Sequence, residues 1–136
     1  MSLSRKPTLC IDFDGVIHNY YAGWRNGEIY GDIVPGFFEW CMKVKGTFTL
    51  AVYSSRTGDD KLRSAMVDWL REKQMTWWNT QPGSEELPIP FTFEFPLNKP
   101  AAWITIDDRC IHFDGRWDSP ELTPDALLAF VSWTNS

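Results

Sequence analysis

Short apolar runs alternate with longer amphipathic and polar segments along this chain. The runs at 7–13, 47–54 and 101–108 are rich in aliphatic, β-branched and aromatic residues, which is typical of buried strands. The segment 89–95 has the same character and predicts a further short strand, and 110–115 predicts an edge strand. All five are short enough for strands, and turn-forming residues separate them.

Helical periodicity appears between these runs. The segment 37–45 follows a Pro-Gly pair and ends before a glycine, and 59–73 carries apolar residues on one helical face with acids in its first turn. The sequence predicts helices over both, a turn and loop over 77–88, and a helix that starts at Thr123. Alternating strands and helices favour a three-layer, Rossmann-like α/β fold with a parallel sheet.

The segment 16–34 contains Asn26 and Gly27 between aromatic and aliphatic residues. Because an Asn-Gly pair readily adopts the positive φ angles of a tight turn, this segment predicts a hairpin after the first strand.

Composition narrows the class of protein. A chain of 136 residues with 43% hydrophobic residues is expected to fold as one soluble domain, 1–136. The net charge of −5 disfavours a general binder of nucleic acid or of anionic membranes. No run approaches the ~20 apolar residues of a membrane span, and the N-terminus does not resemble a signal peptide. Three cysteines without metal-ligand spacing predict free thiols in a reducing cytoplasm.

Polar side chains follow three of the predicted strands at their carboxyl ends. These are Asp12 and Asp14, then Ser54, Ser55 and Arg56, and finally Asp107 and Asp108. Parallel strands end at one edge of the sheet, where ligands of such folds bind. Four carboxylates in one small volume repel each other, so we expect a cation among them, and a set of oxygen ligands suits Mg²⁺.

Lys99 lies just before the predicted strand 101–108 and adds a positive charge to this set of polar side chains. Carboxylates, a divalent cation, a serine hydroxyl and a lysine are the groups that phosphoryl transfer requires.

Four sequence motifs occur in order over residues 9–109: "DFDGV", "YSSR", "NKP" and "WITIDDR". Together they resemble the motifs of the haloacid dehalogenase superfamily of phosphohydrolases. The resemblance implies that fold and a Mg²⁺-dependent phosphatase that works through an aspartyl-phosphate. The superfamily often inserts a cap domain over its site. The segment between Asp14 and Pro35 has room only for a flap hairpin, which implies a single catalytic domain without a cap.

The resemblance also implies a role for each acid. Asp12 would be the nucleophile, and Asp14 the general acid and base. Magnesium would be held by Asp12, by the backbone carbonyl of Asp14 and by Asp107, with Asp108 binding directly or through water.

The remaining motif residues would bind or neutralise phosphate. Ser54 best matches the phosphate-binding serine, with Ser55 as the alternative, and Lys99 would stabilise charge. "SSR" and "DDR" also resemble the phosphatase half of polynucleotide 3′-phosphatases, which makes Arg56 a secondary candidate.

Several alternatives stay open on the sequence alone. The substrate is a phosphorylated compound of unknown identity; a nucleotide or polynucleotide end phosphatase is the second interpretation, with nucleic acid not favoured by the charge. A non-catalytic, receiver-like phosphorylated switch is the third. The flap aromatics are interpreted as packing or as a substrate platform, His18 as structural, and the Trp77–Trp78 pair as packing or as a contact in a homo-oligomer.

Overall fold

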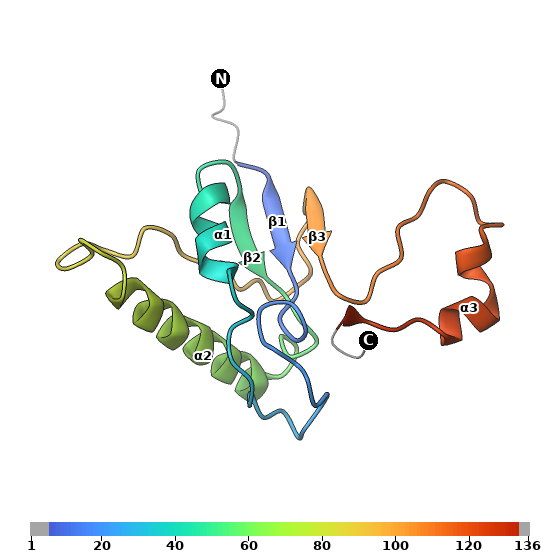
Figure 1. Cartoon of the computed structure of the whole chain (residues 1–136), viewed down its shortest axis with the longest axis horizontal. Coiled ribbons are helices and arrows are strands. Elements are labelled where there is room, and N and C mark those ends of the chain that lie inside the picture. Colours follow the sequence, from blue (N-terminus) through green and yellow to red (C-terminus); the bar gives the residue numbers. More distant parts are fainter. Residues whose placement is uncertain (1–5, 134–136) are drawn as a thin grey trace.

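The computed structural model describes residues 6–133, and a small parallel sheet lies at its centre (Figure 1). Its strands are β1 (Thr8–Ile11), β2 (Thr49–Val52) and β3 (Ile104–Ile106), in the order β2-β1-β3. The register places Cys10 opposite both Ala51 and Thr105. The predicted α/β class with a parallel sheet is therefore confirmed.

The fourth predicted strand is reduced to a single bridge. Glu94 pairs in parallel with Ala51, where its N–H donates to the carbonyl of Leu50 and its carbonyl accepts from the N–H of Val52, both at 2.9 Å. The segment 89–95 thus extends the sheet beside β2 without forming a regular strand. The edge strand expected at 110–115 is absent from the described structure.

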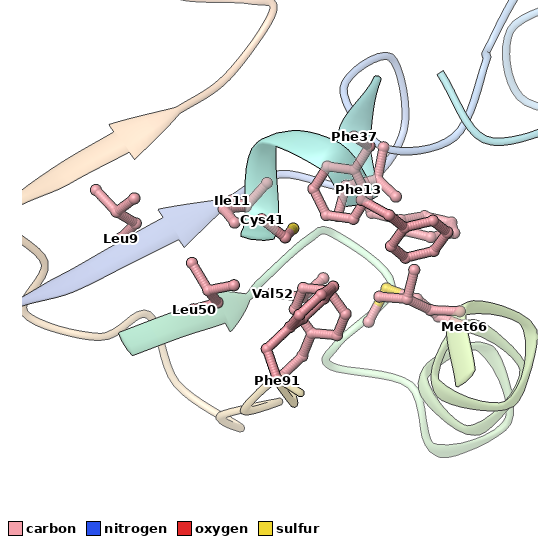
Figure 2. Close-up of a cluster of buried hydrophobic side chains, with 13 residues drawn as sticks. Leu9, Ile11, Phe13, Phe37, Cys41, Leu50, Val52, Met66 and Phe91 are labelled. Carbon is pink, nitrogen blue, oxygen red and sulfur yellow. The ribbon is translucent and has the colours of Figure 1, made fainter. Parts of the chain in front are cut away.

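The hydrophobic core lies between one face of the sheet and two helices, α1 (Phe37–Val44) and α2 (Asp60–Asn79). Alternate strand residues point to this face, as the two-residue period of a strand requires. Figure 2 shows this cluster, which includes Leu9, Ile11, Leu50, Val52 and Met66. Phe91 and Phe93 come from the segment beside β2 and complete the cluster.

Helix α2 is longer than the sequence predicts. It continues past the expected end at 73 to Asn79, so Trp77 and Trp78 are helical rather than part of a turn. Trp77 packs against Phe38 of α1 and donates from Nε1 to the Glu39 carboxylate at 2.7 Å. This contact between the two helices stabilises the additional turns.

The chain after β3 forms an arm that extends away from the sheet (Figure 1). It contains a short 3₁₀ helix, η1 (Pro120–Leu122), and then α3 (Pro124–Leu128), which begins after one intervening residue. Ile104 of β3 faces the same side as Leu9, yet it is 53% exposed, because α1 and α2 do not cover this edge. The arm returns to the sheet at its end, where Trp133 Nε1 donates to the Gly15 carbonyl at 2.6 Å.

Residues 16–34 form a loop with a short antiparallel base. Asn19 N–H donates to the Asp32 carbonyl, and Val34 N–H donates to the Ile17 carbonyl, at 2.9 and 2.8 Å. Asn26 and Gly27 have φ of 54° and 81°, so the expected Asn-Gly turn is present. We call residues 16–34 the flap.

Two remaining expectations concern the cysteines and the membrane. Cys10 and Cys41 are buried, Cys110 is exposed, and all three are free thiols.

No helix within residues 6–133 combines the length and the apolar character that spanning a membrane requires.

Candidate functional site

Three carboxylates meet at the carboxyl ends of β1 and β3. Asp12 directly follows β1, and its N–H donates to the Ile106 carbonyl at 2.9 Å, which aligns the two strand ends. One oxygen from each of Asp12, Asp107 and Asp108 lies within 4.8 Å of the others. We call these residues the acidic triad. The sequence placed all three at this edge, and the structure brings them together.

The acidic triad carries more negative charge than its surroundings neutralise. The pKa of Asp12 is raised to about 7, mainly by burial and in part by the nearby carboxylates of Asp107, Asp108 and Asp14, against a lowering hydrogen bond from the Phe13 backbone. Burial also raises the pKa of Asp108, with a further contribution from Asp107. Oδ2 of Asp108 is buried without a hydrogen-bond partner. A hard cation with oxygen ligands fits this set, because it would neutralise the charge and give that oxygen a partner.

Gly15 is the residue that lets the Asp108 carboxylate approach the loop after β1. Its φ is +84°, a region that residues with a side chain rarely adopt. A Cβ at this position would also collide with Oδ2 of Asp108. The glycine of the "DFDG" motif is thus required both by backbone conformation and by space.

Asp14 lines the same pocket as Asp12 and Asp108 without belonging to the acidic triad, and two buried side chains hold it. Its Oδ2 accepts from Arg56 Nε at 2.8 Å, and its Oδ1 accepts from His18 Nδ1 at 2.8 Å and from Arg56 Nη2 at 3.1 Å. Burial works to raise the pKa of Asp14, but the hydrogen bonds from His18 and Arg56 and the charge of Arg56 outweigh it and leave the pKa below its usual value. Asp14 is therefore held as a carboxylate.

Arg56 connects the ends of β1 and β2 with the flap. The side chain is 0% exposed, and Nη1 donates to the Gly27 carbonyl at 2.7 Å. The guanidinium lies over the rings of Phe13 and Trp24, at 5.6 and 5.1 Å from their centroids. The sequence placed Arg56 among the phosphate-binding candidates, but these contacts bury it behind the pocket.

His18 has a defined hydrogen-bonding role that the sequence did not predict. It is 0% exposed, and its Nε2 accepts from the Gly31 N–H at 2.9 Å. A nitrogen that accepts carries no proton, so Nδ1 carries it and donates to Asp14. The signals in the sequence were weak: His18 lies four residues after Asp14, and Gly31 lies across the flap.

The pocket beside the acidic triad has a volume of about 260 Å³. It is lined by Asp12, Asp14, Tyr20, Gly23, Trp24, Ser55, Asp108 and Arg109. Tyr20, Gly23 and Trp24 come from the flap. The sequence alone allowed the flap aromatics to be either packing or a substrate platform, and two of them line the pocket.

The two serines occupy different environments. Ser54 is buried, and its Oγ accepts from the Arg56 N–H at 3.0 Å and contacts the Met66 sulfur at 3.7 Å. Ser55 is exposed and lines the pocket. Ser55, the alternative candidate, is therefore available to a phosphate, whereas Ser54, which best matches the motif, is buried.

The two basic candidates also differ. Lys99 is exposed and does not line the pocket. Burial raises the pKa of the Cys10 and Cys110 thiols; the charge of Lys99 acts to lower it, and the charges of Asp12 and Asp107 act to raise it. Arg109 lines the pocket and directly follows the Asp107–Asp108 pair. Sequence reasoning gave Arg109 no role, although "DDR" was part of the motif.

Comparison with known proteins gave no match to a family model, to a curated protein or to a solved structure.

We expect Arg56→Met to lower the free energy of unfolding by about 3 kcal/mol, because it leaves the Asp14 carboxylate buried without its cation. Arg25→Met, at an exposed arginine of the same flap, is the control and should change stability by less than about 0.5 kcal/mol. Urea denaturation at neutral pH measures both values. Equal losses in the two variants would show that the Arg56–Asp14 pair does not stabilise this site.

Proposed function

We propose that this chain is a Mg²⁺-dependent phosphatase of the haloacid dehalogenase type, a single domain without a cap that hydrolyses a phosphomonoester through an aspartyl-phosphate on Asp12. The observation that best supports the proposal is the acidic triad at the carboxyl ends of two parallel strands, beside a pocket lined by Ser55 and Arg109. The order of the four motifs supports the same reaction class.

Asp12 is the proposed nucleophile because it belongs both to the acidic triad and to the pocket lining. A carboxylate oxygen of Asp12 attacks phosphorus, and the bond from phosphorus to the ester oxygen breaks as the alcohol leaves. Water then attacks the phosphorus of the aspartyl-phosphate, which regenerates the Asp12 carboxylate and releases inorganic phosphate. Magnesium held by Asp12, Asp107 and Asp108, with the Asp14 carbonyl, would neutralise the charge on these carboxylates and on the phosphoryl group.

Asp14 is the proposed proton carrier for both steps. As a carboxylate it suits the second step, in which it takes a proton from the attacking water. Both of its oxygens accept hydrogen bonds from Arg56, and one also accepts from His18. To protonate the leaving alcohol in the first step, Asp14 must first take up a proton from solvent, and an oxygen that carries this proton must give up at least one of these hydrogen bonds.

Phosphate binding is assigned to groups that face the pocket. Ser55 offers a hydroxyl and Arg109 a guanidinium, both suited to donate to phosphoryl oxygens. Lys99 stays the candidate for charge stabilisation, and its exposed side chain has to turn towards the acidic triad to act. The substrate is a phosphorylated compound, and a cytoplasmic location is part of the proposal.

The first test is hydrolysis of an aryl phosphate with Mg²⁺ by the wild type and by Asp12→Asn. We expect the variant to lose at least about 10³-fold in kcat, because an amide cannot act as the nucleophile. Asp114→Asn, an exposed acid in the arm, is the matched control and should keep wild-type turnover.

Turnover by Asp12→Asn at the wild-type rate would exclude Asp12 as the nucleophile. A wild-type protein that becomes phosphorylated and stays so, without turnover, would instead favour the phosphorylated switch.

The second test separates the two serines. Ser55→Ala should raise the KM for the aryl phosphate by about tenfold, the effect of losing one hydrogen bond to a charged group, and leave stability within about 0.5 kcal/mol. Ser54→Ala should lower the free energy of unfolding by about 1 kcal/mol, because its Oγ is buried and bonded. The reverse pattern would assign phosphate binding to Ser54.

The third test is stabilisation by Mg²⁺ at two pH values. Without metal, the pKa of Asp12 is about 7 in the folded chain, above its ordinary 3.8, so stability falls as pH rises between those values. Because Mg²⁺ requires the ionised carboxylate, it should raise the melting temperature more at about pH 8 than at about pH 5.5.

Asp107→Asn should reduce this Mg²⁺ response, and Asp114→Asn should keep it. An equal shift at both pH values, or an unchanged shift in Asp107→Asn, would contradict a metal at the acidic triad.

A further inference from the structure

The pocket beside the acidic triad is too small to enclose a whole substrate. At about 260 Å³ it lies below the ~300–1,000 Å³ that is usual for pockets enclosing small molecules. It can hold a phosphoryl group and the atoms next to it. The rest of a substrate must therefore extend over the rim, and the flap residues Tyr20, Gly23 and Trp24 form part of that rim.

Trp24 is the flap aromatic that presents a large surface to this rim. Tyr20 and Tyr30 stack on each other, with centroids 6.3 Å apart, and both contact the His18 ring. The Tyr30 hydroxyl is also fixed by the Ala22 N–H and the Gly23 carbonyl. Trp24, in contrast, lines the pocket and remains 54% exposed.

The indole of Trp24 is supported from one side. The Arg56 guanidinium lies over its ring at 5.1 Å from the centroid, and Arg56 itself is 0% exposed. Arg56 is in turn fixed by Asp14 and by the Gly27 carbonyl. Because the guanidinium lies over one ring face, the face of Trp24 left for a ligand is the opposite one, and the contact with the buried Arg56 side chain restrains the ring.

We propose that the exposed face of Trp24 is a binding subsite for a flat ring, so that the preferred substrate is a phosphomonoester that carries a nucleobase or another planar aromatic group near its phosphate. This rests on the proposed phosphatase function, which it extends to the substrate class. A fixed indole stacks on any planar ring, because each such ring offers a π face.

The charges favour a small substrate over a polymer. Arg109 is the cation among the described residues that line the pocket, and three of the lining residues are aspartates. The whole chain has a net charge of −5. Such a surface can neutralise one phosphate group with a bound cation but repels a long polyanion, so a mononucleotide-sized compound fits better than a nucleic acid chain.

The experiment compares kcat/KM for three substrates: a nucleoside monophosphate, an aryl phosphate and glycerol phosphate, which has no ring. In the wild type we expect kcat/KM for the better of the two ring-containing substrates to exceed kcat/KM for glycerol phosphate by at least tenfold. Trp24→Ala should reduce that ratio by about tenfold, and Trp24→Phe should restore most of it. Trp103→Ala, at a tryptophan that is 71% exposed on the sheet edge, should leave the ratio unchanged. Circular dichroism confirms that each variant is folded.

A ratio near one in the wild type, or a ratio that Trp24→Ala does not change, would overturn the ring subsite while leaving the phosphatase intact. If no phosphate ester is hydrolysed, the proposed function fails. A binding measurement then tests whether Trp24 forms the ring subsite. Calorimetry with Mg²⁺ then compares a nucleoside monophosphate with inorganic phosphate. A tighter Kd for the nucleotide that Trp24→Ala abolishes supports the subsite, and equal affinities or no binding by either overturn it.

Discussion

The buried ion pair between Arg56 and Asp14 is the interaction on which the rest of the site depends. A guanidinium without solvent exposure needs a full set of partners, because a charge left unpaired in the interior costs several kcal/mol. Arg56 finds these partners in two consecutive segments: Asp14 and the Phe13 ring in the loop after β1, and the Gly27 carbonyl and the Trp24 ring in the flap. The end of β2, the loop and the flap are thereby held in one arrangement.

This pair also places four carboxylates in two different environments. Asp14 receives its positive charge from within the protein and is held as a carboxylate. Among the described residues the charge of Arg109 acts on Asp108 of the acidic triad, but the Asp12 pKa stays raised and one oxygen of Asp108 has no hydrogen-bond partner. If Arg56 reached the triad instead, it would compete with an external cation. In the reaction that we propose, the internal ion pair leaves the triad available to a metal and keeps Asp14 separate for proton transfer.

Sequence patterns predicted which strand ends meet but not where each side chain points. Asp12, Asp107 and Asp108 follow from the parallel sheet alone, because the carboxyl ends of its strands share an edge. Ser54, Ser55 and Arg56 lie beyond the end of β2, where alternation no longer applies, and local hydrogen bonds turn Ser54 and Arg56 inward. The role of His18 depends on Gly31, a contact across the flap that no local spacing reveals.

Gly15 joins the acidic triad to the end of the chain. Its positive φ and the absence of a Cβ admit the Asp108 carboxylate on one side, and its carbonyl accepts from Trp133. The loop after β1 is held by β3 through the bond from the Asp12 N–H to the Ile106 carbonyl, by the end of β2 through Arg56, and by the returning arm through Trp133. Because Asp12 and Asp14 begin this loop, contacts from three parts of the chain fix the backbone that carries both. A fixed backbone suits the reaction that we propose, since a nucleophile and a proton carrier must keep their geometry while charge develops between them.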